Sequence, residues 1–202
     1  MQENKPTGQA LKFAFNVPNT FTAVRVILAI VIACLLILGS KSEILAAGII
    51  LIIAAITDFF DGFLARRLGQ SSLFGSLFDI VADQCLFMPS LILAIAAGRF
   101  ARTDGLMPFN PYPYAIPALA GGVTVLAGVG IFLWKSHRRA MEFPTPTMVA
   151  KTNYWFWLAP LILAILGIGP DILLAVLMYL AIISTVLTFY SYLKKGSYVF
   201  TD

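Results

Sequence analysis

Residues 57–84 read TDFFDGFLARRLGQSSLFGSLFDIVADQ and place four aspartates in a chain that is otherwise strongly apolar. The whole sequence has ten acidic residues, and these four fall within 26 positions: Asp58, Asp61, Asp79 and Asp83. An aspartate near the centre of a membrane costs about 3 kcal/mol on insertion scales. The stretch therefore requires something that binds or neutralises its carboxylates.

The composition around this stretch is that of an integral membrane protein. Of the 202 residues, 59% are hydrophobic and 12% are charged, and the mean hydropathy is +0.88, whereas soluble domains are less apolar. Apolar runs long enough to cross about 30 Å of hydrocarbon predict spans at 21–39, 44–65, 75–97, 113–134, 152–168 and 171–193. We therefore expect an all-α membrane fold with six transmembrane helices.

The predicted organisation is one membrane domain, residues 21–193, between two short terminal segments. Residues 1–20 contain LKFAFNVPN, which is compatible with a short interfacial helix, and residues 194–202 form a short tail. At the start of the fifth span, the aromatic run YWFW, residues 154–157, is typical of an interfacial belt. No nucleic-acid partner is expected of such a chain.

The lysines and arginines predict the orientation, because cytoplasmic loops carry an excess of them. An even number of spans places both termini on one side, and ten cations lie there: Lys5, Lys12, Arg66, Arg67, Lys135, Arg138, Arg139, Lys151, Lys194 and Lys195. The other side has Lys41, Arg99 and Arg102, and Arg25 lies inside the first span. Both termini and the aspartate stretch are therefore predicted to be cytoplasmic.

Helical spacing predicts that the aspartates meet in one cleft. Asp58 and Asp61 are three residues apart on the second predicted helix, and Asp79 and Asp83 are four apart on the third, in line with Gly75. Residues at these spacings share a helix face, and two helices joined by a short loop are antiparallel neighbours. We therefore expect both acidic faces to line one cleft that opens to the cytoplasm.

Two kinds of partner suit such a cleft. Arg66 and Arg67 are candidates for a purely structural ion-pair cluster, although two cations leave an excess of carboxylates. Hard divalent cations fit the excess better, because carboxylate oxygens without nearby His or Cys are typical ligands of Mg²⁺ or Mn²⁺. The four aspartates thus favour a site for two metal ions.

The aspartate stretch resembles the signature of the CDP-alcohol phosphatidyltransferases. Its fixed positions read Asp58-x-x-Asp61-Gly62-x-x-Ala65-Arg66, eight residues, then Gly75-x-x-x-Asp79-x-x-x-Asp83. The resemblance implies a six-helix enzyme, usually homodimeric, that transfers the phosphatidyl group of CDP-diacylglycerol to an alcohol and releases CMP. It is a phospholipid-synthesis reaction in which a hydroxyl oxygen attacks phosphorus.

The same resemblance implies roles for individual residues. The four aspartates would hold two Mg²⁺ or Mn²⁺ ions, and Asp83 would also act as the general base on the acceptor hydroxyl. The resemblance assigns CDP binding to six residues: Asp58, Asp61, Gly62, Ala65, Arg66 and Gly75. Among these, the small residues would let the nucleotide approach the backbone, while the arginine would contact its phosphates.

The alcohol acceptor is predicted from looser features. Two segments resemble parts of phosphatidylglycerophosphate synthases and cardiolipin synthases: NVPNTFTAVR, residues 16–25, and MVAKTN, residues 148–153. Two positions depart from the residues usual in these enzymes, Ala150 in the second segment and Gln84 at the end of the aspartate stretch. A cytoplasmic set of cations is expected to bind the phosphate of glycerol 3-phosphate: Lys135, Arg138, Arg139 and Lys151. The alternative roles of these cations are topology signals and contacts with anionic lipid, and the role of His137 is left open.

Several alternative functions remain at this level. Phosphatidylglycerol as the acceptor would make the chain a cardiolipin synthase, and an inositol phosphate or serine would give other phospholipids. A divalent-cation transporter is the alternative outside enzymes. A transporter site is expected near the middle of the membrane with access from both faces, which the one-sided aspartates do not favour.

Overall fold

The computed structural model describes residues 17–68, 73–106, 111–136 and 148–196. This part of the chain contains six α-helices, one short 3₁₀ helix and no strand. The α-helices are α1 Val17–Leu38, α2 Lys41–Leu68, α3 Leu73–Ala96, α4 Tyr112–Ser136, α5 Met148–Leu166 and α6 Asp171–Gly196, and the 3₁₀ helix is η1 Ala101–Thr103. The predicted all-α class with six helices is confirmed.

The helices follow the predicted spans but several continue beyond them. α2 runs over 41–68, against a predicted span of 44–65. An apolar run marks the hydrocarbon layer, whereas a helix with its own backbone hydrogen bonds can continue into the polar interface. By length and composition, three described segments are able to cross a membrane: Thr20–Leu38, Leu77–Ala96 and Asp171–Thr188. The number of crossings stays a prediction.

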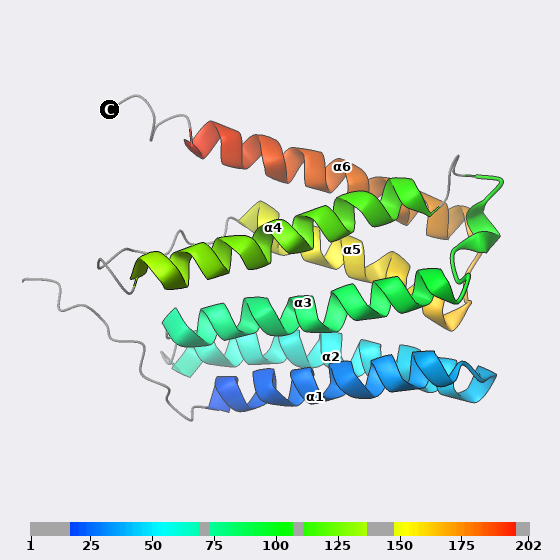
Figure 1. Ribbon diagram of the computed structural model, residues 1–202, viewed down its shortest axis with the longest axis horizontal. Helices are drawn as coiled ribbons and strands as arrows, with labels where there is room; N and C mark the ends of the chain where they lie inside the picture. Colours follow the sequence, from blue (N-terminus) through cyan, green and yellow to red (C-terminus); the bar gives the residue numbers. More distant parts are fainter. Residues whose placement is uncertain (1–16, 69–72, 107–110, 137–147, 197–202) are drawn as a thin grey trace, which may run out of the picture.

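The helices lie side by side along one long axis (Figure 1). α1 packs along both α2 and α3, α5 packs along α6, and α5 also contacts α2 and α3. α4 contacts α3 and α6. The start of α1 and the end of α6 lie at the same end of the bundle, which we call the termini end (Figure 1). The opposite end, where α1 turns into α2 and α5 into α6, is called the turn end.

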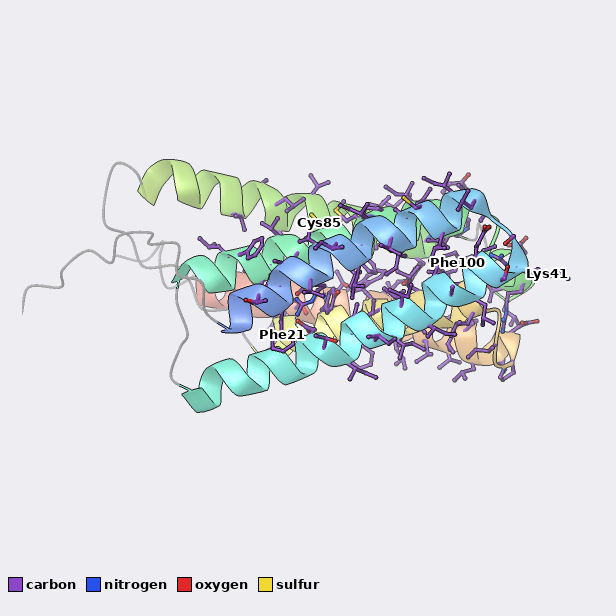
Figure 2. All side chains as sticks on the ribbon, turned by 90° about the horizontal axis from the view of Figure 1, so that it is seen from below. Phe21, Lys41, Cys85 and Phe100 are labelled. Atoms are coloured by element: carbon purple, nitrogen blue, oxygen red, sulfur yellow. The ribbon has the colours of Figure 1, made fainter. Side chains whose placement is uncertain are left out.

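Small residues in α2 allow close packing, whereas the outer surface is apolar. Ala47, Leu51 and Ala54 of α2 are fully buried. A Cβ atom at Gly48 would lie 2.3 Å from Cδ2 of Leu166 in α5, so a side chain there would force this leucine to move. Large apolar side chains on many helices are exposed, as the sticks along the bundle between Phe21 and Lys41 illustrate (Figure 2). This surface fits contact with lipid chains.

Two groups of polar contacts lie at the turn end. The backbone N–H of Ser40 donates to the Glu43 carboxylate at 2.9 Å, and the Glu43 N–H donates to Oγ of Ser40 at 3.4 Å, which caps the start of α2. Hydrogen bonding with the Ser40 side chain, and then with its backbone, lowers the pKa of Glu43. In η1, Arg102 donates to Oδ1 of Asp171 at 2.7 Å and to the carbonyls of Ile168 and Gly169. Arg102 thereby ties the connection between α3 and α4 to the start of α6.

The aromatic run at residues 154–157 is only partly at the surface. Trp155 and Phe156 are exposed, but Trp157 is buried. Its indole N–H donates to Oγ1 of Thr185 in α6 at 2.9 Å, and its carbonyl accepts the Tyr114 hydroxyl of α4 at 2.6 Å. The prediction of an interfacial belt is wrong for Trp157, because a buried indole needs a partner and a neighbouring helix supplies one. Trp157 therefore fastens α5 to α4 and α6.

Candidate functional site

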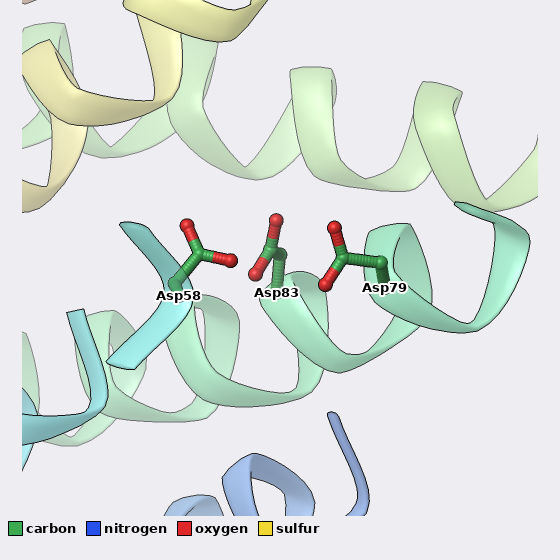
Figure 3. A group of neighbouring side chains, drawn as sticks. All are labelled: Asp58, Asp79 and Asp83. Carbon is green, nitrogen blue, oxygen red and sulfur yellow. The ribbon is translucent and has the colours of Figure 1, made fainter. Parts of the chain in front are cut away.

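Three of the aspartates come together between α2 and α3. Asp58 projects from α2, and Asp79 and Asp83 project from successive turns of α3 (Figure 3). One carboxylate oxygen from each residue lies within 4.8 Å of the other two. The i, i+4 spacing aligns the two aspartates of α3, and the short connection to α2 brings the third beside them. The cluster, Asp58, Asp79 and Asp83, is hereafter called the carboxylate cluster.

The remaining residues of the signature lie on the same two helices. Asp61 follows Asp58 by three residues in α2, and Gly75 precedes Asp79 by one turn in α3. Gly62, Ala65 and Arg66 also belong to α2, toward the termini end. The side chains of Asp61, Ala65 and Arg66 fall outside what the structure describes, so their predicted contacts remain predictions.

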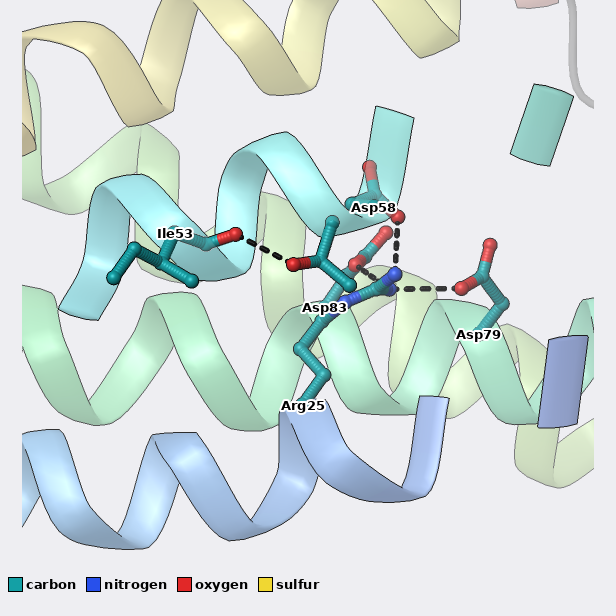
Figure 4. Close-up of polar contacts among 6 residues, drawn as sticks. Arg25, Ile53, Asp58, Asp79 and Asp83 are labelled. Atoms are coloured by element: carbon teal, nitrogen blue, oxygen red, sulfur yellow. Dashed lines mark hydrogen bonds and ion pairs between the residues drawn. The ribbon is translucent and has the colours of Figure 1, made fainter. Parts of the chain in front are cut away.

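A buried arginine from α1 stands at the centre of the carboxylate cluster. The Arg25 side chain is 1% exposed. Its Nη1 donates to Oδ1 of Asp79 and to Oδ1 of Asp83, each at 2.8 Å, and its Nη2 pairs with Oδ1 of Asp58 at 2.7 Å (Figure 4). One guanidinium therefore bridges three carboxylates from two other helices.

Arg25 is the site residue that sequence reasoning missed. The sequence suggested Arg66 and Arg67 as partners, since they lie within the aspartate stretch itself. Arg25 is distant in sequence and reaches the aspartates only because α1 packs against both α2 and α3. The available signal was a single cation inside the apolar segment Thr20–Leu38, because a charge in such a segment needs a partner.

The carboxylate cluster keeps an excess of negative charge. Among the described residues, three carboxylates face one guanidinium, so the fully ionised cluster has two formal negative charges in excess. The side chains of Asp58 and Asp83 are 18% and 20% exposed, whereas that of Asp79 is 41% exposed. The cluster is therefore open on the side of Asp79, and it attracts cations from that side.

The donor chemistry of the cluster fits a hard divalent cation. All of its candidate ligand atoms are carboxylate oxygens, and they converge closely enough for a single ion to reach several of them. The described part of the cluster provides three carboxylates, and Asp61 lies one helical turn away from Asp58. The three described carboxylates suit one such ion.

Helix α4 approaches the site closely beside Asp83. A Cβ atom at Gly122 of α4 would lie 2.7 Å from Oε1 of Gln84 and 2.8 Å from the sulfur of Met88, both in α3. The absence of a side chain at Gly122 thus makes room for Gln84, the residue next to Asp83. This packing brings α4 close to α3 next to the carboxylate cluster.

The predicted acceptor cations lie at the termini end or outside the described residues. Lys135 belongs to the last turns of α4 and Lys151 to the first turn of α5, and both of these helix ends lie toward the termini end (Figure 1). Arg138, Arg139 and His137 lie outside the described residues. The carboxylate cluster is also displaced toward the termini end, since it uses the beginning of α3 and the second half of α2.

Comparisons with known proteins agree with the signature. The family described as CDP-alcohol phosphatidyltransferase matches residues 15–189. The chain is 43% identical over 79 residues to the CDP-diacylglycerol--glycerol-3-phosphate 3-phosphatidyltransferases of Escherichia coli (strain K12) and Shigella flexneri serotype 5b (strain 8401). Each alignment covers 39% of this chain and 43% of the relative, so it spans less than half of the length of these relatives.

Proposed function

Because this chain belongs to the CDP-alcohol phosphatidyltransferase family, we propose that it transfers the phosphatidyl group of CDP-diacylglycerol to glycerol 3-phosphate and releases CMP. The observation that carries the proposal is the convergence of Asp58, Asp79 and Asp83, three fixed positions of the signature, at one site. The product is phosphatidylglycerophosphate.

The reaction proposed is a displacement at the phosphorus atom of the phosphatidyl group. The hydroxyl oxygen of the acceptor forms a bond to that phosphorus, and the bond from phosphorus to the bridging oxygen of the pyrophosphate breaks. CMP leaves with the bridging oxygen. The acyl chains of CDP-diacylglycerol remain in the lipid while its head group enters from the termini end.

We assign the binding of two divalent cations, Mg²⁺ or Mn²⁺, to Asp58, Asp61, Asp79 and Asp83. Such ions, when bound, neutralise the pyrophosphate and stabilise charge on the attacking and leaving oxygens. The all-oxygen donor set and the negative excess of the carboxylate cluster support this assignment. Asp79 is the most exposed of the three described carboxylates, and we place the arriving head group on its side of the cluster.

We assign proton transfer to Asp83. Its carboxylate would accept the proton of the acceptor hydroxyl as the new bond to phosphorus forms. A central position supports this role, since Asp83 lies between Asp58 and Asp79 in the cluster (Figure 3). Gly62, Ala65 and Gly75 would leave space for the nucleotide, and Arg66 would contact its phosphates.

Glycerol 3-phosphate is favoured as the acceptor by two observations. The relatives named above carry that substrate in their names. In addition, Lys135 and Lys151 lie on helix ends at the termini end, where a phosphorylated, water-soluble acceptor would enter. Arg138 and Arg139 would complete this cationic set. We also propose that both termini face the cytoplasm and that the enzyme is a homodimer.

A product assay tests the proposal directly. Purified protein is incubated with CDP-diacylglycerol, divalent metal and, separately, glycerol 3-phosphate, phosphatidylglycerol, inositol phosphate or serine, and the lipid product is identified by mass spectrometry. We expect phosphatidylglycerophosphate and CMP in equal amounts. Cardiolipin formed from phosphatidylglycerol, without use of glycerol 3-phosphate, would refute the acceptor and leave phosphatidyl transfer intact. An absence of CMP with every acceptor would refute the transferase activity.

A further inference from the structure

The position of Arg25 has a consequence for metal binding. Its guanidinium contacts an oxygen of each member of the carboxylate cluster, at 2.7 to 2.8 Å. The oxygen atoms that converge within 4.8 Å of one another belong to the same three carboxylates. The arginine therefore pairs with the same three carboxylates that a divalent cation would need.

The two cations also repel each other. A unit charge and a double charge a few ångströms apart in a partly buried site repel each other strongly, because the surroundings screen them less than bulk water does. The site is screened weakly on the arginine side, because the Arg25 side chain is 1% exposed. A metal ion that enters from the open side at Asp79 thus meets a guanidinium already in place.

The same contacts stabilise the bundle when no metal is bound. Without Arg25, three carboxylates from α2 and α3 would face each other with no described cation among them, and their repulsion would push the two helices apart. The guanidinium is suited to this role because it is planar and presents several N–H donors in a fixed fork, so that one side chain serves three partners.

On these grounds we infer that Arg25 is an internal counter-cation that holds Asp58, Asp79 and Asp83 together until metal binds, and that metal binding displaces it from at least one of its ion pairs. Arg25 is then a positioning residue rather than a ligand or a base. This inference rests on the proposed function, since it assumes that the carboxylate cluster is the metal site. It predicts that stronger ion pairs of Arg25 lower the affinity of the site for metal.

The test compares Mn²⁺ binding to the wild-type protein, Arg25→Gln and Arg25→Lys in detergent, by calorimetry, together with Tm in chelator and in Mn²⁺. Arg25→Gln removes the competing charge, so we expect its Kd for Mn²⁺ to fall about tenfold or more. Its Tm in chelator should fall, and its gain in Tm on adding Mn²⁺ should exceed that of the wild type. Arg25→Lys keeps the charge but loses the forked donors. Its Kd for Mn²⁺ and its Tm in chelator should therefore lie between those of the wild type and those of Arg25→Gln.

A matched control is Arg102→Gln, which removes an arginine–aspartate ion pair at the turn end. Its Kd for Mn²⁺ should equal that of the wild type, and its change in Tm should be the same in chelator and in Mn²⁺. If Arg25→Gln does not fold, Arg25→Lys alone decides, because a tighter Kd for Mn²⁺ is expected there as well.

Unchanged or weaker Mn²⁺ binding in the folded Arg25 variants would overturn the inference while the wild type still binds metal, and the proposed function would stand. A wild-type protein that binds no divalent cation, yet turns over substrate, would overturn both the inference and the metal assignment. Phosphatidyl transfer itself would survive that result, because the product assay tests it separately.

Discussion

Two arginines of this protein pair with aspartates toward opposite ends of the bundle, and their surroundings differ. At the turn end, Arg102 is 19% exposed and pairs with Asp171, which is 54% exposed. Toward the termini end, Arg25 is 1% exposed and pairs with three carboxylates. The first contact is balanced in charge and open to solvent, whereas the second lies among the helices and, among the described residues, sets three carboxylates against one guanidinium.

The difference separates a contact that holds two loops together from the site to which we assign bound metal. An exposed ion pair contributes about 0–1 kcal/mol, so Arg102 mainly fixes the path of the chain. A partly buried site with unbalanced charge costs stability, because the charges lose water and repel one another. A cation bound from solution, as proposed here, would supply the missing positive charge and offset this cost.

The largest effect is expected from replacing a carboxylate in the unbalanced site. In Asp83→Asn we expect kcat to fall by about 10²–10⁴-fold, since the variant loses the proposed base. Binding of CDP-diacylglycerol should be substantially retained, because three aspartates would still hold metal. Asp61→Asn, by contrast, should lose both turnover and binding, because Asp61 is assigned to CDP binding as well as to metal binding. Steady-state kinetics and equilibrium binding measure the two quantities, and equal losses of binding would remove the case for a separate base.

A smaller effect is expected from replacing a lysine at the termini end. Lys151→Ala should raise the KM for glycerol 3-phosphate about tenfold, the size expected for one charge-assisted hydrogen bond. The KM for CDP-diacylglycerol should change little, and added salt should weaken acceptor binding in the wild type. Lys41→Ala, at the exposed turn end, is the matched control. An unchanged acceptor KM in Lys151→Ala would leave that lysine with a topological role only.

Loss of the Arg102–Asp171 ion pair is expected to lower stability without changing metal binding. Arg102→Gln loses its contacts with Asp171 and with the carbonyls of Ile168 and Gly169, which should lower the free energy of unfolding by about 1 kcal/mol. Thermal unfolding in chelator and in Mn²⁺ should give the same decrease. A decrease that depends on metal would break the distinction between the two arginine sites.

The smallest effect concerns Glu43, which caps α2 at the turn end. Its pKa is lowered from the ordinary value of 4.5, so its charged form stabilises the fold above that pH. This contribution is lost as the pH falls through the lowered pKa. The Tm of Glu43→Gln should therefore be slightly below that of the wild type at pH 7, and the difference should disappear once the pH is below the lowered pKa of Glu43. A difference that persists at low pH would show that the charge is not involved.

The sequence predicts the helices well because hydrocarbon thickness sets the length of an apolar run. The limits of α2 were less predictable, since nothing in the apolar pattern shows how far a helix continues into the interface. The capping pair of Ser40 and Glu43 does mark its start. Trp157 was misplaced for a different reason, because a tryptophan near a span end suits either the interface or a buried hydrogen bond.

Within the candidate site, local spacing predicted the convergence of the aspartates, and tertiary packing decided the rest. Asp79 and Asp83 had to share a face at a separation of four residues, whatever surrounded α3. The partnership with Arg25 depends on how α1 lies against two other helices, which periodicity cannot show. A lone cation in an apolar run is the pattern that indicates such a partner.

The central claim is that the unbalanced carboxylate site acts in catalysis through divalent metal. The most direct measurement is CMP release from CDP-diacylglycerol and glycerol 3-phosphate by protein stripped of metal, with the residual metal content verified, before and after adding back Mg²⁺ or Mn²⁺. We predict no turnover in excess chelator and recovery with the added ion. Undiminished CMP release by the metal-free protein would contradict the account.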